Sequence, residues 1–125
     1  MIALDTSALI DVVCGYKRSL GRLVALVEVG ERVVLPALVV YEWLRGPRSA
    51  EELSDQQLLF KDDALMPFDA EDAALAARLY RSVKRPRGRE VDLAIAAWAI
   101  RHEAELWTFN RADFADIPGL RLYRQ

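Results

Sequence analysis

The pattern of apolar and polar positions along the chain predicts short strands that alternate with helices. Ile2 to Leu4 is an apolar run that ends at Asp5-Thr6-Ser7, which predicts a buried strand leading into a capped helix. A second strand is expected at Arg32 to Leu35, because this segment is rich in β-branched residues. Further strands are predicted at Ala64 to Phe68, Leu106 to Phe109 and Leu120 to Tyr123.

Segments with helical spacing lie between these strands. Leu20, Leu23, Val24 and Val27 recur at helical intervals, and Gly30 provides a stop. Further helices are predicted at 37–45, at 50–60, after the capping pair Asp69 and Asp72, and at 90–103. Strands that alternate with helices imply an α/β fold, a three-layer α/β/α sandwich around a mostly parallel sheet of four to five strands. Residues 1–125 are expected to form a single domain, because no linker or repeat interrupts the pattern.

Composition narrows the class of protein. The 125 residues are 53% hydrophobic and 29% charged, a balance typical of one ordinary domain that needs no metal or disulfide in order to fold. The longest apolar run, Leu93 to Ile100, is far shorter than the ~18 residues of a membrane span. The single cysteine, Cys14, cannot form an internal disulfide and fits the reducing cytoplasm.

The small net charge of −2 conceals a separation of charge along the chain. Residues 42–72 contain nine acidic and three basic side chains, whereas residues 78–89 contain six basic side chains and no acid. A basic segment of this kind is typical of surfaces that bind polyanions. The overall charge therefore does not exclude a nucleic-acid partner.

Four carboxylates lie at positions that are unusual for a purely structural acid. Asp5 ends the first strand, Glu42 emerges from an otherwise apolar helix face, Asp92 interrupts an apolar helix, and Asp113 follows a later predicted strand. Converging carboxylates raise the pKa values of one another unless a hard cation neutralises them. Oxygen ligands favour Mg²⁺ or Mn²⁺, and one histidine with one cysteine cannot form an ordinary zinc site.

Four segments of the chain carry a resemblance to a known family. They are Ile2 to Ile10, Val40 to Gly46, Val91 to Ala97 and Thr108 to Phe114. In this order, and over nearly the whole chain, they resemble the motifs of the PIN-domain family, and specifically of the VapC-type toxin ribonucleases of bacterial toxin–antitoxin pairs.

The resemblance implies a four-carboxylate catalytic site with supporting polar groups. Its acids would be Asp5, Glu42, Asp92 and Asp113, with Asp5 and Asp92 as metal ligands, and Thr6, Ser7 and Asn110 would support it by hydrogen bonding. Two positions leave an alternative. Glu90 lies close to Asp92, which is preferred because the apolar stripe of the helix lies beside it, and Asp116 lies one helical turn from Asp113 and could share its role.

The activity that the resemblance implies is that of a Mg²⁺-dependent endoribonuclease. A metal-activated water would cleave RNA and leave a 5′-phosphate and a 3′-hydroxyl. The basic residues that lead into Asp92 are predicted to bind RNA phosphates; they are Lys84, Arg85, Arg87 and Arg89. The implied partners are a transfer or ribosomal RNA substrate, a cognate antitoxin protein and a second copy of the chain in a homodimer, all in the cytoplasm.

Two other functions compete with this interpretation. One is a catalytically weak RNA-binding module with the same fold. The other is phosphoryl transfer through an aspartyl phosphate at Asp5, which the sequence disfavours because no second acid follows in Asp5-Thr6-Ser7. His102 is interpreted as an ordinary helix residue, and the three tryptophans, Trp43, Trp98 and Trp107, are expected in the core.

Overall fold

In the computed structural model, which describes residues 1–124, four parallel strands form a sheet in the order β3-β2-β1-β4. The strands are β1 (Ile2–Leu4), β2 (Val33–Pro36), β3 (Leu65–Met66) and β4 (Glu105–Trp107). The helices are α1 (Thr6–Val13), α2 (Leu20–Glu28), α3 (Ala37–Arg45), α4 (Ala50–Leu59), α5 (Ala70–Ser82), α6 (Glu90–Arg101) and α7 (Arg111–Phe114), with one 3₁₀ turn at Asp62–Ala64.

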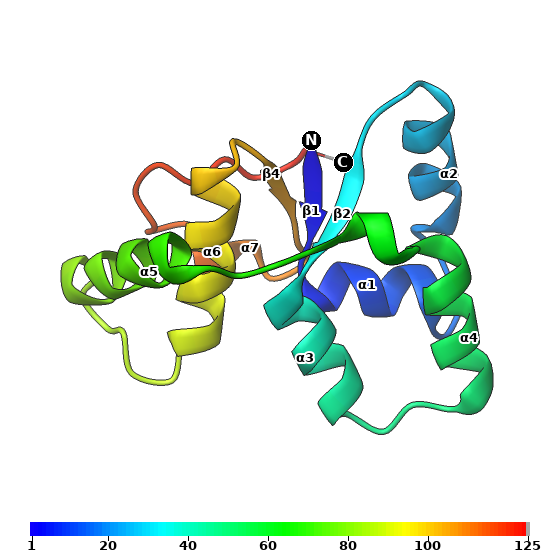
Figure 1. Ribbon diagram of the computed structural model, residues 1–125, viewed down its shortest axis with the longest axis horizontal. Coiled ribbons are helices and arrows are strands. Elements are labelled where there is room, and N and C mark those ends of the chain that lie inside the picture. The colour runs from blue at the N-terminus through cyan, green and yellow to red at the C-terminus, as the bar shows by residue number, and fades with distance from the viewer. Residues whose placement is uncertain (125) are drawn as a thin grey trace.

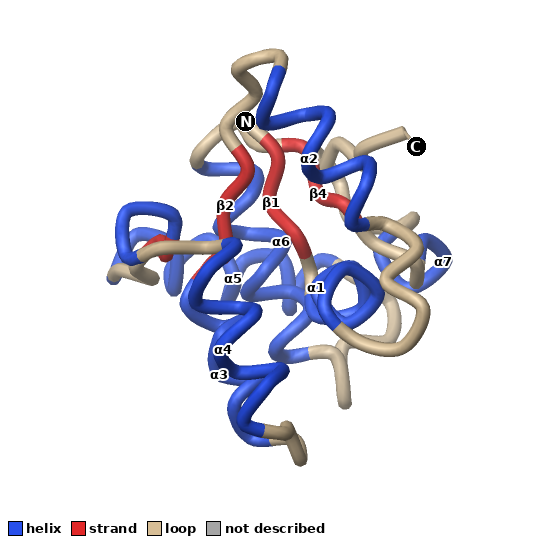
Figure 2. Tube along the Cα trace, turned by 90° about the vertical axis from the view of Figure 1, so that its right-hand side faces the viewer, coloured by secondary structure: helices blue, strands red, loops and turns tan. Residues whose placement is uncertain are grey.

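The helices cover both faces of the sheet. Helix α1 packs against α2 and α4, whereas α5 packs against α6, and the two groups lie on opposite sides of the strands (Figures 1 and 2). Helix α3 contacts both α1 and α6 and so joins the two layers. The predicted three-layer α/β fold with a parallel sheet is confirmed.

Strand β1 lies in the middle of the sheet. Ile2, Ala3 and Leu4 are all buried, because helices cover both faces of a parallel sheet and leave no solvent side for polar residues. The strand pairs on one side with β2 and on the other with β4, where Leu4 lies opposite Trp107. The residues that follow, Asp5 and Thr108, therefore leave the sheet side by side at its carboxyl edge.

The end of the chain departs from the predicted strands. Leu122 forms only one isolated parallel bridge with Leu106, so the strand predicted at Leu120 to Tyr123 is not formed as a regular element. Strand β4 also ends at Trp107 and does not continue to Phe109. The reason is local, since the backbone N–H of Asn110 donates to the Thr108 hydroxyl at 2.9 Å and turns the chain away from the sheet into α7, which was not predicted.

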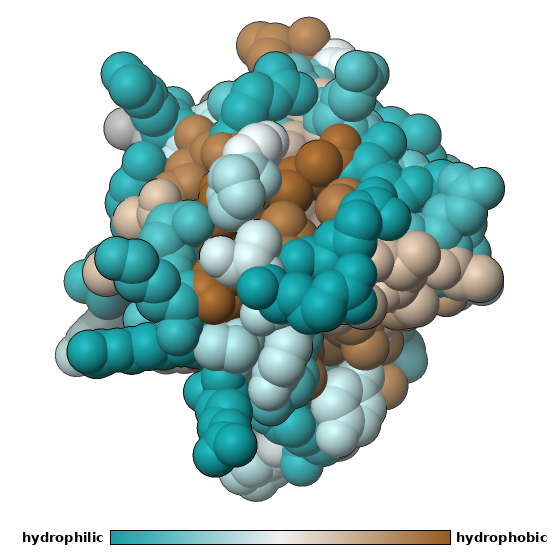
Figure 3. All heavy atoms as spheres, turned by 90° about the vertical axis from the view of Figure 1, so that its left-hand side faces the viewer, coloured by the Kyte–Doolittle hydropathy of each residue, from teal (hydrophilic) through white to brown (hydrophobic). Residues whose placement is uncertain are grey.

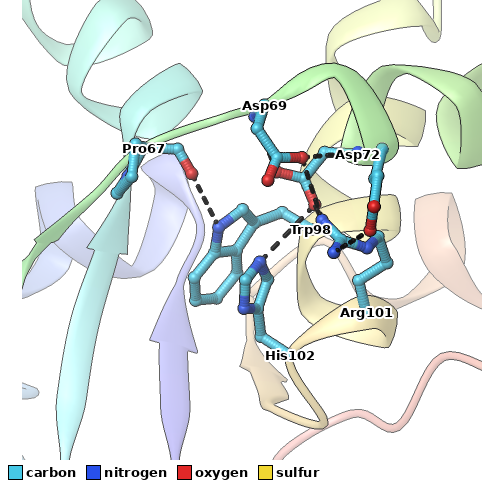
Figure 4. Close-up of polar contacts among 7 residues, drawn as sticks. Pro67, Asp69, Asp72, Trp98, Arg101 and His102 are labelled. Carbon is cyan, nitrogen blue, oxygen red and sulfur yellow. Dashed lines mark hydrogen bonds and ion pairs between the residues drawn. The ribbon is translucent and has the colours of Figure 1, made fainter.

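An ionic cluster joins the start of α5 to the end of α6 (Figure 4). Asp69 and Asp72 form the predicted capping box of α5. Arg101 of α6 pairs with the fully buried Asp72 at 2.6 Å and also with Asp69 and Glu71. His102 is the C-cap residue of α6, and its ring stacks on Trp98 with ring centroids 4.3 Å apart. The cluster holds the end of α6 against the start of α5.

The surface over α5 is mostly hydrophilic. On this face, polar side chains surround a smaller central area of apolar atoms (Figure 3). A shallow hollow between α5 and α6 is lined by Ala76, Tyr80, Glu90 and Leu93. The three tryptophans are buried, as predicted. Among residues 1–124, no helix is both long and apolar enough to cross a membrane.

Candidate active site

Asp5 is held rigidly at the carboxyl edge of the sheet. It is the N-cap residue of α1, and its side chain is only 5% exposed. Its Oδ1 accepts hydrogen bonds from the Ala8 backbone N–H at 3.0 Å and from the Ser7 hydroxyl at 2.6 Å. Its Oδ2 accepts a hydrogen bond from the Thr108 hydroxyl at 2.6 Å. Because both carboxylate oxygens are oriented, Asp5 is preorganised for a role at this edge.

Thr108 also belongs to the site, although no pattern in the sequence assigned it a role. It is fully buried and donates to Asp5 from a position 103 residues away in the chain. Its place near the carboxyl end of the strand predicted at Leu106 to Phe109 was the available signal, because the carboxyl ends of neighbouring parallel strands meet at one edge. Only the pairing of β1 with β4 shows that the two residues are neighbours.

Glu42 approaches the same region from α3. The Thr6 hydroxyl donates to its Oε1 at 2.5 Å, and Arg45 lies 3.4 Å from its Oε2. These contacts compensate a carboxylate that the sequence placed on an apolar helix face. Thr6 and Ser7 thus each support a different acid, Glu42 and Asp5 respectively.

Asp92 completes the group as the third residue of α6. Burial raises the pKa of its carboxyl from 3.8 to about 6, and the negative charges of Glu42, Asp5 and Asp113 act in the same direction. Arg89 opposes this shift. Three carboxylates from separate parts of the chain therefore lie within electrostatic reach of Asp92.

The two alternatives for the acidic residues occupy different environments. Glu90 lines the hollow between α5 and α6, whereas Asp92 is influenced by Asp5 and Glu42. Asp116 forms an ion pair with Arg89 at 2.6 Å. These contacts favour Asp92 and Asp113 as the members of the carboxylate group.

The basic segment before α6 divides into two parts. Lys84, Arg85 and Arg87 are exposed. Arg89 is half-buried and donates to the Asp113 carbonyl at 2.9 Å as well as to Asp116, so it links the start of α6 to α7. Asn110 contributes to the site network through its backbone N–H.

The donor set matches a hard divalent cation in type. All four acids offer oxygen ligands, and Mg²⁺ commonly uses one or two carboxylates while it retains several waters. In residues 1–124, no group of three or more acidic, histidine or cysteine side chains is arranged as a preformed metal site. A site with two carboxylate ligands, Asp5 and Asp92, fits both observations.

Replacing Asp92 by asparagine is expected to stabilise the metal-free protein at neutral pH. The folded-state pKa of Asp92, about 6, lies above its ordinary value of 3.8. The ionised carboxyl therefore destabilises the fold increasingly as the pH rises from about 4 to about 6, and fully above that. The shift corresponds to about 3 kcal/mol, which solvent screening at this partly exposed position reduces to about 1–2 kcal/mol.

Urea unfolding in EDTA measures this effect. The Asp92→Asn variant should gain stability over the wild type at about pH 7.5 and not at about pH 3, which lies below both pKa values, so that the carboxyl is largely protonated in the folded and the unfolded state. An equal gain at both pH values would contradict the electrostatic explanation.

The chain matches the PIN domain over residues 2–120, and it therefore belongs to the PIN-domain family, as the sequence motifs indicated. No curated protein sequence gives a significant match. The fold is similar to VapBC2 from Rickettsia felis bound to a DNA fragment from their promoter, with 20% identity, a TM-score of 0.79 and coverage of 100% of this chain and 99% of that chain.

Two further solved structures share the fold. A toxin–antitoxin complex from Klebsiella pneumoniae is 23% identical, with a TM-score of 0.74 and coverage of 100% of both chains. DNA-bound VapBC from Salmonella typhimurium is 18% identical, with a TM-score of 0.79 and coverage of 98% of this chain and 96% of that chain. At these identities the similarity establishes the fold, and the chemistry must be argued from the site.

Proposed function

We propose that this protein is a Mg²⁺- or Mn²⁺-dependent endoribonuclease of the VapC type, the toxin of a toxin–antitoxin pair. The observation that carries the proposal is the convergence of Asp5, Glu42, Asp92 and Asp113 at the carboxyl edge of the sheet. Similarity of fold to toxin–antitoxin complexes supports the same assignment.

Each residue of the site has a separate proposed role. Asp5 and Asp92 are the proposed metal ligands, and Ser7 and Thr108 hold the Asp5 oxygens in a fixed orientation. A divalent cation bound there supplies an activated water and offsets negative charge on the phosphodiester. Glu42, fixed by Thr6, adds to the negative potential that attracts the cation.

The RNA backbone is proposed to approach along the segment that leads into α6. Lys84, Arg85 and Arg87 are exposed and free to meet phosphates, which sets affinity rather than sequence preference. Arg89 has a different position, because its guanidinium is engaged by Asp116 and the Asp113 carbonyl. It fixes α7 next to α6 and is expected to contribute less to RNA binding than the other three.

Chelation of metal tests the proposed function. Purified protein is expected to cleave total RNA in Mg²⁺ or Mn²⁺ and to lose this activity in excess EDTA, because no pair of histidines is present to supply acid and base without a metal. Mapping of the new 5′ ends identifies the target and shows whether they carry phosphate. Undiminished cleavage in EDTA would overturn the metal-dependent assignment.

The partners follow from the same proposal. We expect a cognate antitoxin and a second copy of the chain to bind. Large apolar side chains are exposed on α2 and α4, among them Val24, Val27 and Leu58, and such side chains are available to a protein partner. The molar mass by light scattering, alone and with a co-expressed antitoxin, measures both assemblies.

A further inference from the structure

An open hollow adjoins the Asp5 carboxylate on the side of α1. It encloses about 400 Å³, within the range of sites that hold small ligands, and among its lining residues are Ser7, Ile10, Cys14, Tyr16, Arg18 and Phe109. Ser7 links the hollow to the carboxylate, because it is a lining residue and its hydroxyl donates to Asp5 Oδ1 at 2.6 Å. Any polymer bound at Asp5 would therefore have this hollow next to its point of contact.

Exposed apolar side chains gather around the hollow. Phe109 is 46% exposed, Tyr16 is almost entirely exposed, and Ile10 is partly exposed. These three side chains are not among those that form or pack against the hydrophobic core. Single exposed apolar residues need no explanation, but three around one hollow beside a carboxylate site are typical of a binding surface.

Phe109 is tied directly to the catalytic network. Its backbone N–H donates to the Ser7 hydroxyl oxygen at 3.0 Å, and the same hydroxyl donates to Asp5. The preceding residue, Thr108, donates to the other oxygen of Asp5. The aromatic ring therefore starts from a backbone position that is fixed relative to the proposed metal ligand.

The remaining walls combine an uncharged thiol, Cys14, with an ion pair between Arg18 and Asp11. Burial and a hydrogen bond with Glu52 raise the pKa of the Cys14 thiol to about 11, so it stays uncharged at neutral pH. Asp11 accepts a hydrogen bond from Ser19 and lies 3.6 Å from the largely exposed guanidinium of Arg18. An aromatic ring with a nearby arginine suits single-stranded nucleic acid, whose bases stack while its phosphates meet cations.

We propose that this hollow binds one unpaired nucleobase of the RNA, stacked on Phe109, next to the phosphodiester held at Asp5. The inference rests on the proposed RNA substrate and names the part of the RNA that the enzyme reads by shape. The polar groups of the hollow, which are the Ser7 hydroxyl and the ion pair of Arg18 with Asp11, favour a nucleotide over an apolar peptide segment.

The test measures binding separately from cleavage. The Asp92→Asn background is expected to prevent cleavage and leaves the Asp5, Ser7 and Phe109 contacts intact. The probe is a short oligouridylate with a single 2-aminopurine, whose fluorescence is quenched when the base stacks on an aromatic ring. In this background, Phe109→Ala should weaken binding by about tenfold and remove the quenching, whereas Phe109→Tyr should stay within about twofold.

Val29→Ala is the matched control, since Val29 is an exposed apolar residue at the far end of α2 and does not line the hollow. It should change neither affinity nor quenching. Unchanged affinity and quenching in Phe109→Ala would overturn the proposal. The proposal would also be overturned if Phe109→Ala lost affinity for an antitoxin peptide and kept its affinity for the RNA probe.

The same experiment separates this proposal from the proposed function. Phe109-dependent quenching in a protein whose wild type cleaves no RNA would support the nucleobase site and contradict the nuclease. RNA cleavage by the wild type with quenching that does not depend on Phe109 would support the nuclease and overturn the nucleobase site. The Phe109→Ala variant is expected to remain folded, with the melting temperature of the wild type, because the ring lies outside the core.

Discussion

Replacing Asp5 by asparagine is expected to lower the rate of RNA cleavage by roughly a thousandfold while the protein remains folded. The change removes one negative charge from the proposed metal site, and stabilisation of charge there is worth several kcal/mol in the transition state. Asparagine is as good an N-cap as aspartate, so α1 should keep its start. Initial rates on an RNA substrate at fixed Mg²⁺, with circular dichroism for folding, measure the effect.

Asp69→Asn is the matched control for this variant. Asp69 is also an N-cap aspartate, but it lies at the start of α5 in the ionic cluster with Arg101. It is expected to retain wild-type cleavage. If Asp5→Asn cleaves as fast as the wild type, Asp5 takes no part in the chemistry and the proposed site is wrong.

The largest loss of stability is expected from Asp72→Ala, at about 2–3 kcal/mol. Asp72 is fully buried, accepts the Asp69 backbone N–H at 2.8 Å and pairs with Arg101 at 2.6 Å. The substitution removes one of the two hydrogen bonds of the capping box and the buried partner of the ion pair with Arg101. The remaining contacts of Arg101 with Asp69 and Glu71 keep the loss below the ~3–5 kcal/mol of a fully isolated buried charge.

Glu71→Gln isolates the contribution of burial. Glu71 pairs with the same Arg101 at 2.6 Å, but its side chain is 78% exposed, and exposed pairs contribute little. The Glu71→Gln variant should have the same unfolding midpoint in urea as the wild type. The midpoint of Asp72→Ala should be clearly lower. Equal midpoints for all three proteins would show that the ionic cluster does not stabilise the contact between α5 and α6.

Local patterns in the sequence predicted several elements closely. Helix α3 was expected at 37–45 and spans Ala37–Arg45, because Gly46 and Pro47 end it. Helix α5 was expected after Asp69, whose side chain accepts the backbone N–H of Asp72 as the capping signal requires. The last predicted strand failed, because its alternating residues meet β4 at a single bridge and not along a strand.

The sequence by itself determined the order of the strands and helices from β1 to β4 and the position of Asp5 at the end of β1. These features depend on hydrophobic periodicity and capping, which act over a few residues. Only the tertiary structure decided that Thr108 supports Asp5, that Arg89 is engaged by Asp116, and that Phe109 leaves the sheet for the hollow. The hydrogen bond between Asp5 and Thr108 requires β1 and β4 to lie side by side. Side-chain partners so far apart in the sequence are set by strand pairing and helix packing, and a local sequence pattern does not contain this information.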